Sequence, residues 1–254
     1  MICAKNEAKK LKKNLPLILE QDYHNFEVVL INDGSTDKTL KVMEAFKNDY
    51  DNIKIVDVKS IEAFWGNKKY ALTLGIKAAT HDFLLFTDAD CKPLSKQWIS
   101  EMSSRFSNTK SIVLGYGTYY KIKGSFLNKL IRFETLMTAI QYFSYAKMGQ
   151  PYMAVGRNLA YRKDEFFKVN GFTSHMHVLS GDDDLFVNQI AHANNTTICI
   201  DKASFTESIP KTSIKAWLRQ KKRHLSTAYY YKREHQLLLG LFNISQILFW
   251  TLTI

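Results

Sequence analysis

Residues 83–90 read FLLFTDAD, and this stretch decides the fold. Four consecutive apolar residues are typical of a strand that is buried on both faces. The carboxylates of Asp88 and Asp90 follow where this strand should end, and both lie on one side because side chains alternate along an extended chain. Two such oxygen ligands suit Mg²⁺ or Mn²⁺ held together with a diphosphate. Taken alone, the Asp-x-Asp pattern is also typical of a solvated turn.

Strand and helix patterns alternate on both sides of this stretch. Strands are expected at residues 27–31 and 53–58, and helices at residues 11–21, 36–48 and 68–79. Such alternation predicts an α/β fold with a mostly parallel sheet and helices on both faces, in which ligands bind beyond the carboxyl ends of the strands. The second half of the chain predicts strands at 112–120 and 158–161 and helices at 126–146 and 183–193.

The net charge of +11 lies mostly near the two ends of the chain. Residues 211–235 hold eight Lys and Arg side chains against the single acid Glu234, whereas residues 236–254 carry no charge. An uncharged run of this length approaches the roughly 20 residues that a helix needs to cross a bilayer. We therefore expect a basic juxtamembrane segment at 211–235 and the start of a transmembrane or interfacial helix at 236–254. The expected partner is a membrane rather than nucleic acid, with the preceding residues on its cytoplasmic side.

The cysteines are odd in number, because the chain has only Cys3, Cys91 and Cys199. Their spacing contains no Cys-x-x-Cys pair, so neither a disulfide framework nor a structural zinc site is supported. This usage fits a reducing environment that faces the cytosol. Polar residues 5–7 stand where a secretory signal would have its apolar core, so no such signal is expected.

Two further motifs precede the Asp-x-Asp pair. Residues 32–37 read NDGSTD after the strand expected at 27–31, and a turn with a helix N-cap would by itself account for them. Residues 66–72 read GNKKYAL, a basic helix start that suits an anion. The combination carries more weight than either motif, because an acidic turn, a basic helix start and an Asp-x-Asp pair all follow strands of one sheet.

In this order the motifs resemble those of the family two glycosyltransferases, almost from end to end. The residues that carry the resemblance are 4–8 (AKNEA), 33–35 (DGS), 68–72 (KKYAL), 88–90 (DAD), 156–162 (GRNLAYR), 171–172 (GF), 180–185 (SGDDDL) and 220–224 (QKKRH). The resemblance implies the Rossmann-like A-type glycosyltransferase fold in a membrane-associated, bacterial-type member. His224 stands where membrane-bound members have the Trp of Gln-x-x-Arg-Trp, and this departure weakens any expectation of processive polymer synthesis.

The resemblance also implies a role for each candidate residue. Asp90 would bind Mn²⁺ or Mg²⁺ directly, with Asp88 assisting. Asp183 is favoured as the catalytic base and Asp182 comes next, because three consecutive aspartates leave the register open. The acceptor side would include Gly156, Arg157 and Asn158. The nucleotide-sugar would contact Ala4, Asn6, Glu7, Asp33, Lys68, Asp88 and Arg223.

These roles imply an inverting, metal-dependent transfer of a hexose from a nucleotide-diphosphate sugar, expected to be UDP-linked, to a hydroxyl of a glycan or lipid acceptor in cell-envelope polysaccharide synthesis. The catalytic domain would span residues 1–210, with a nucleotide-binding half at 1–95 and an acceptor-binding half at 96–210. A haloacid-dehalogenase-type phosphatase also has Asp-x-Asp after a strand, but after its first strand. An inactive membrane-anchored scaffold of the same fold is the non-enzymatic alternative, and the intact acidic clusters argue against it.

Overall fold

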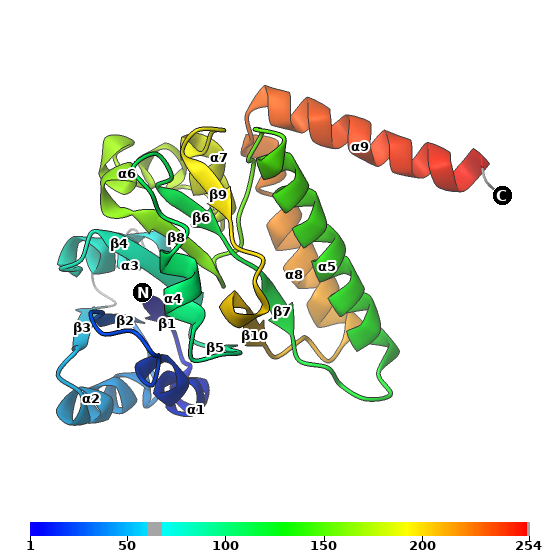
Figure 1. Cartoon of the computed structure of the whole chain (residues 1–254). Coiled ribbons are helices and arrows are strands. Elements are labelled where there is room, and N and C mark those ends of the chain that lie inside the picture. Colours follow the sequence, from blue (N-terminus) through cyan, green and yellow to red (C-terminus); the bar gives the residue numbers. More distant parts are fainter. Residues whose placement is uncertain (60–67, 253–254) are drawn as a thin grey trace.

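A computed structural model describes residues 1–59 and 68–252, and most of them belong to one twisted sheet and its covering helices (Figure 1). The sheet order is β3 (Ile53–Val58), β2 (Val28–Asp33), β1 (Ile2–Ala4), β4 (Phe83–Asp88), β8 (Leu159–Arg162), β6 (Ile112–Leu114) and β9 (Thr196–Ile198). Strands β1 to β4 are mutually parallel where they pair, β8 is antiparallel to both β4 and β6, and β9 is parallel to β6. The predicted mostly parallel α/β sheet is confirmed.

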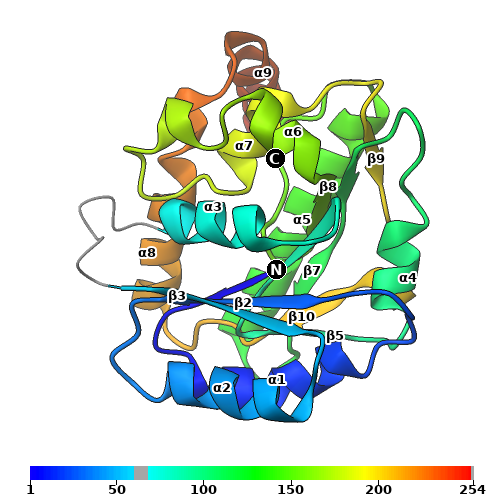
Figure 2. The ribbon, with the colours of Figure 1, turned by 90° about the vertical axis from the view of Figure 1, so that its left-hand side faces the viewer.

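Helices cover both faces of this sheet (Figure 2). The side chains of β2 supply both cores, because Val28 and Leu30 point to one face and Val29 and Ile31 to the other. Burial on both faces explains the continuous apolar sequence of the strand. The first face is covered by α1 (Ala8–Leu19), α2 (Thr39–Asp49) and α4 (Trp98–Ser103), and the second by α3 (Lys68–Ala78), α5 (Phe126–Lys147), α6 (Lys163–Lys168) and α7 (Asp184–Ile190).

The strand predicted at 112–120 is in fact two strands in different sheets. Its first part is β6, and its second part is β7 (Gly117–Tyr119), which joins β5 (Cys91–Pro93) and β10 (Thr206–Ser208) in a small sheet. The chain changes sheets at Gly115, where an added Cβ would lie 2.5 Å from Cγ of Asn158. Glycine has no Cβ, so the backbone can pass this close to the Asn158 side chain at the point where β6 has ended and β7 has not yet begun.

The carboxyl ends of the parallel strands meet at one edge. Ala4 at the end of β1 is paired with Asn32 of β2, and Cys3 is paired with Asp88 of β4. The predicted strand at 83–86 continues to Asp88, so the first aspartate of the pair belongs to the strand and Asp90 follows it. This edge therefore gathers the motifs that the sequence placed after separate strands.

The last part of the described chain contains α8 (Ile214–Leu225) and α9 (Arg233–Leu252). Figure 1 shows α8 running alongside α5, while α9 projects from the body of the protein. Among the described residues, none of the helices combines the length and the apolar character that crossing a membrane requires. The transmembrane or interfacial helix expected at 236–254 therefore stays a prediction, as does the division of the chain at residues 95 and 210.

Candidate active site

Asp88 and Asp90 form the centre of the acidic edge. Together with Cys91 they offer side-chain ligand atoms that all lie within 4.8 Å of one another. Burial, with the negative charge of Asp88 next, raises the pKa of Asp90 above its ordinary value. Among the described residues Asp90 has an ion pair with Lys10, whose Nζ lies 3.8 Å from Asp90 and 2.9 Å from Glu7. Asp90 is thus a carboxylate whose negative charge is poorly balanced by the protein.

Lys68, the first residue of α3, joins two of the predicted motifs. Its Nζ lies 3.0 Å from Oδ1 of Asp88 and 2.8 Å from Oδ2 of Asp182. Burial disfavours the ammonium, but the charges of Asp182 and Asp88 outweigh it and hold the pKa of Lys68 well above its usual range. Burial likewise opposes the charge on Asp88, yet Lys68 holds the pKa of this carboxyl below its ordinary value. The ammonium therefore links the Asp-x-Asp motif to the distant triple aspartate.

The three consecutive aspartates have three different environments. Asp182 faces Lys68, and its side chain is 15% exposed. Asp183 caps α7, because its Oδ1 accepts the Asp184 N–H at 2.8 Å and its Oδ2 accepts the Gly156 N–H at 2.6 Å. Burial, followed by the charges of Asp182 and Asp184, raises the pKa of Asp183 to about 7. Only the first of these aspartates faces the cation that also holds Asp88.

Asp184 connects α7 to the C-terminal segment. Its Oδ2 accepts a hydrogen bond of 2.8 Å from the hydroxyl of Tyr231 and another from the hydroxyl of Thr227. Asp184 and Tyr231 are each 8% exposed, and Thr227 is fully buried. Sequence reasoning missed Thr227 and Tyr231, because neither belongs to a periodic pattern and no short motif relates them to the aspartates. This contact fixes the chain just after α8, which carries Arg223.

Several of the residues predicted to contact the nucleotide gather around Asn6. Its backbone has a φ of 57°, and its Oδ1 accepts the Thr36 N–H at 2.8 Å. The Asn6 N–H donates to Oγ of Ser35 at 3.0 Å, and Nζ of Lys5 lies 3.6 Å from Asp33. The predicted residues Asn6 and Asp33 therefore lie close together across two neighbouring strands. Glu7 lies beside them at the start of α1, and Ala4 is fully buried below.

The predicted acceptor-side residues have unequal positions. Gly156 is tied to Asp183 by the hydrogen bond above, and an added Cβ would lie 3.2 Å from the Asp183 carboxylate. Arg157 stacks over Tyr119 at 4.3 Å from the ring centroid and donates to Oγ of Ser208 at 3.0 Å. Asn158 is fully buried, so it supports the site from beneath rather than facing it.

Asn158 uses its whole amide to join separate elements. Its Oδ1 accepts the Trp98 indole N–H at 2.9 Å, and its Nδ2 donates to the carbonyls of Tyr116 at 3.0 Å and Ser204 at 2.7 Å. These partners belong to α4, to the turn before β7 and to a short 3-10 helix at Lys202–Ser204. The side chain thereby links the small sheet to the main sheet.

A cleft of about 420 Å³ opens from the acidic edge between α5 and α8. Lys68, Asp88, Asp182 and Asp183 line its inner end, and Gln220 and Arg223 line the wall formed by α8. An ion pair between Lys221 and Glu134 and a 3.3 Å hydrogen bond from Gln220 to the Tyr119 hydroxyl hold α8 against the body. The structure therefore brings Lys68, Asp88, Asp182, Asp183 and Arg223 around one cavity. Gly66 and Asn67 of the predicted basic helix start lie outside the described residues.

The sheet order and the acidic edge define a protein of the A-type glycosyltransferase fold. The chain belongs to glycosyl transferase family 2, whose family model matches residues 1–170. The predicted family is therefore confirmed, and the Asp-x-Asp pair lies at the end of the fourth strand of this fold rather than after the first strand, where the phosphatase alternative needs it.

Curated relatives match this chain over limited segments. A poly-beta-1,6-N-acetyl-D-glucosamine synthase from Staphylococcus epidermidis is 32% identical over 90 residues, which are 35% of this chain and 21% of that protein. The glycosyltransferase AglE from Haloferax volcanii is 31% identical over 112 residues, which are 43% of this chain and 35% of that protein. The chain thus matches only about a fifth to a third of the length of these relatives.

Two solved structures share the fold with this chain. The mannosyltransferase PcManGT from Pyrobaculum calidifontis, in complex with GDP-Man and Mn²⁺, matches with a TM-score of 0.69 and 19% sequence identity. The match covers 91% of this chain and 64% of the mannosyltransferase chain. TarS 1-349 from S. aureus in complex with UDP-GlcNAc has a TM-score of 0.58 and 18% identity, with 84% of this chain and 58% of that chain covered. At such low identity the likeness establishes the fold alone.

Proposed function

We propose that this chain transfers a sugar from a nucleotide diphosphate sugar to a hydroxyl of a glycan or lipid acceptor, with inversion at the anomeric carbon. The observation that carries the proposal is the position of Lys68 between Asp88 and Asp182. A cation shared by the Asp-x-Asp motif and by a second carboxylate at the mouth of a cleft suits a leaving diphosphate on one side and an attacking hydroxyl on the other.

The donor set at Asp88, Asp90 and Cys91 fits a divalent metal ion. The Asp90 carboxylate has a raised pKa because burial and Asp88 disfavour its charge, so a cation placed there would offset this cost. Burial also raises the pKa of the Cys91 thiol far above neutral, so the site offers oxygen rather than thiolate ligands. Oxygen ligands suit Mg²⁺ or Mn²⁺. When bound, such an ion would neutralise charge on the leaving diphosphate.

We propose Asp182 as the catalytic base, in place of the Asp183 favoured on the sequence. Both oxygens of Asp183 already accept backbone N–H groups, one of them as the cap of α7. The pKa of about 7 would suit Asp183 as a base, but a backbone N–H already orients each of its oxygens and takes one lone pair on each, so fewer positions remain for an acceptor hydroxyl. Within the part of the chain that the structure describes, Asp182 pairs with Lys68 alone, and a bound diphosphate would also attract this ammonium. Geometry therefore outweighs basicity in this assignment.

The donor and the acceptor are proposed more broadly. The acidic turn at Asp33 and Asn6 supports a base that donates hydrogen bonds, and uracil is the base we propose. The tyrosine-lined cleft between α5 and α8 supports a sugar acceptor, because aromatic side chains pack on apolar sugar faces. The cytoplasmic orientation expected from residues 211–235 stays a prediction. Protease protection in membrane vesicles would measure on which side of the membrane the catalytic domain lies.

Titration calorimetry with UDP and Mn²⁺ tests the donor site. We expect binding that requires the metal and that falls by at least about tenfold in Asp90→Asn, since removing one charged ligand costs over about 1.4 kcal/mol. A folded protein that binds no nucleoside diphosphate with metal would overturn the proposal. The base is tested separately by metal-dependent hydrolysis of nucleotide-sugars: Asp182→Asn should abolish turnover, while survival of turnover in this variant and loss in Asp183→Asn would restore Asp183.

A further inference from the structure

Helix α5 is apolar on two opposite sides. Its inner side packs into the protein through Ile131, Ala139 and Tyr142, each at most 3% exposed. Its outer side carries a second stripe at spacings of three and four residues, which follow one face of a helix. The outer stripe consists of Phe126, Leu130, Phe133, Met137 and Ile140, which are exposed by 79%, 38%, 63%, 42% and 50%.

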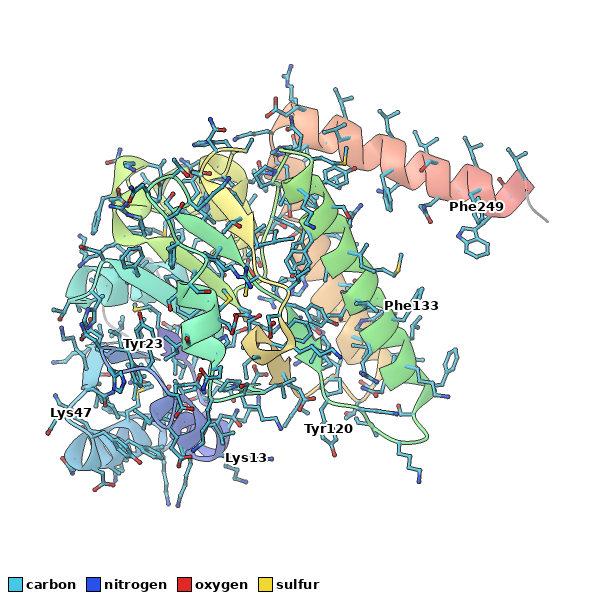
Figure 3. All side chains as sticks on the ribbon, viewed as in Figure 1. Lys13, Tyr23, Lys47, Tyr120, Phe133 and Phe249 are labelled. Carbon is cyan, nitrogen blue, oxygen red and sulfur yellow. The ribbon has the colours of Figure 1, made fainter. Side chains whose placement is uncertain are left out.

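Exposed apolar side chains continue on the two helices that contact α5. The Lys221–Glu134 ion pair holds α8 beside α5, and the hydroxyl of Tyr145 donates to the Leu238 carbonyl of α9 at 3.1 Å. Figure 3 shows Phe133 on the side of α5 that faces away from the sheet and Phe249 on the projecting α9. Soluble proteins rarely leave so many large apolar side chains exposed to water on neighbouring helices. The added exposed side chains are Ile214, Leu218 and Leu225 of α8 and Leu241, Ile244 and Ile247 of α9.

The charge of α8 indicates what covers this surface. The exposed cations Lys215, Arg219 and Lys222 alternate with the exposed apolar residues along the helix, and residues 214–225 contain no acid. At this spacing each cation lies within one helical turn of an apolar side chain. A lipid surface offers the matching arrangement, since its anionic headgroups lie directly above its acyl chains. An acidic protein partner would need carboxylates interleaved with apolar side chains at the same repeat.

We propose that the outer stripe of α5, with the exposed faces of α8 and α9, docks on an anionic lipid bilayer. The apolar side chains enter the boundary between headgroups and acyl chains, and the cations of α8 contact the phosphates. The charge pattern at residues 211–254 indicated a membrane but assigned no part in its binding to α5. Because the cleft beside Asp182 opens between α5 and α8, docking through these helices places that cleft next to the bilayer. Docking does not depend on the transferase chemistry.

Flotation of the whole chain with vesicles tests the docking surface. We expect co-flotation with phosphatidylglycerol vesicles, weaker binding to phosphatidylcholine vesicles, and a loss of the difference in high salt. Replacing Phe133 and Ile140 together by Ser should weaken partitioning into phosphatidylglycerol vesicles by at least about tenfold, because two apolar side chains leave the interface. Neutralising Lys215 and Arg219 to Gln should weaken it about 25-fold, the product of about fivefold for each cation.

Two controls separate docking from general surface stickiness and from the active site. Ile200→Ser removes an equally exposed apolar side chain, at 56%, from the loop after β9 and should leave vesicle binding unchanged. The Phe133 and Ile140 variant should retain the UDP and Mn²⁺ affinity of the parent, since neither residue lines the cleft. Vesicle binding that is equal on both lipids, that survives these α5 substitutions, or that is lost equally in Ile200→Ser would overturn the proposal. Failure of the folded parent chain to bind UDP and Mn²⁺, with its vesicle binding intact, would count against the proposed transferase function and not against docking.

Discussion

Removing the hydroxyl of Tyr231 should destabilise the protein and loosen α8 at the same time. In Tyr231→Phe the buried Oδ2 of Asp184 loses the 2.8 Å hydrogen bond and keeps only the one from Thr227. A hydrogen bond to a charged group contributes about 1.5–3 kcal/mol, and the 8% exposure of both side chains leaves little room for water to replace it. For a chain of this size we expect a fall in Tm of about 3–12 °C.

Urea unfolding and thermal unfolding of matched variants measure this effect. Tyr229→Phe is the control, because Tyr229 lies in the same segment and is 82% exposed; it should change stability by less than about 0.5 kcal/mol. In the Asp184→Asn background, Tyr231→Phe should cost at least about 1 kcal/mol less than in the parent, as expected for residues in contact. A full cost in that background would refute the assigned hydrogen bond, and so would an unchanged stability of the single variant.

Three further predictions concern the residues around the cleft. Lys68→Met should lower UDP and Mn²⁺ affinity and reduce stability by about 1–3 kcal/mol in urea unfolding, less than a fully buried pair would lose, because the Lys68 side chain is 37% exposed. The pKa of Asp183 is raised to about 7 in the folded protein, so the folded state binds an extra proton between about pH 4 and pH 7, and folding stability falls as the pH rises through this window. Asp183→Asn lacks this titration, so pH-dependent unfolding should show its stability rising relative to that of the parent over the same window. Parallel stability profiles for the two proteins would contradict the assigned shift. Lys69 is 1% exposed and donates to the carbonyls of His175 at 2.6 Å and Val178 at 3.0 Å. Lys69→Met should leave those carbonyls unpaired and speed amide hydrogen exchange in residues 175–182. Lys77→Met is the control, because Lys77 is exposed on the last turn of the same helix, and it should leave this exchange unchanged.

The sequence predicted the sheet well because its strands have a strong local signal. The apolar runs of β2 and β4 and the β-branched residues of β3 can be recognised without their partner strands, and acidic residues mark the ends of β2 and β4. The prediction of one strand at 112–120 was wrong, because the chain divides into β6 and β7 where Gly115 passes close to Asn158, a residue distant in sequence. Local patterns cannot report where the backbone must pass another segment.

The candidate site was predicted in its residue types but less well in its contacts. Asp88, Lys68 and the triple aspartate were found from motif order, and the structure brings them together around one cleft. The bond from Lys68 to Asp182 and the two hydroxyls on Asp184 were not foreseen, because such pairings depend on how α3, α7 and the C-terminal segment pack. The helix at 126–146 was predicted, but its outer stripe was not, since periodicity alone does not tell which of two apolar sides of a helix is buried.

Asn158 gives this fold a position with almost no mutational freedom. Aspartate could still accept the Trp98 indole, but it would place a carboxylate against the carbonyls of Tyr116 and Ser204, and leucine would leave all three groups unpaired. At about 1–3 kcal/mol for each buried unpaired group, either substitution approaches the whole stability of a typical domain. A saturation library selected for folded protein should therefore retain asparagine alone at 158. A library at the solvent-exposed position Ile200 should accept most residues. The number of residue types accepted at each position would therefore distinguish the contact between the two sheets from the exposed surface.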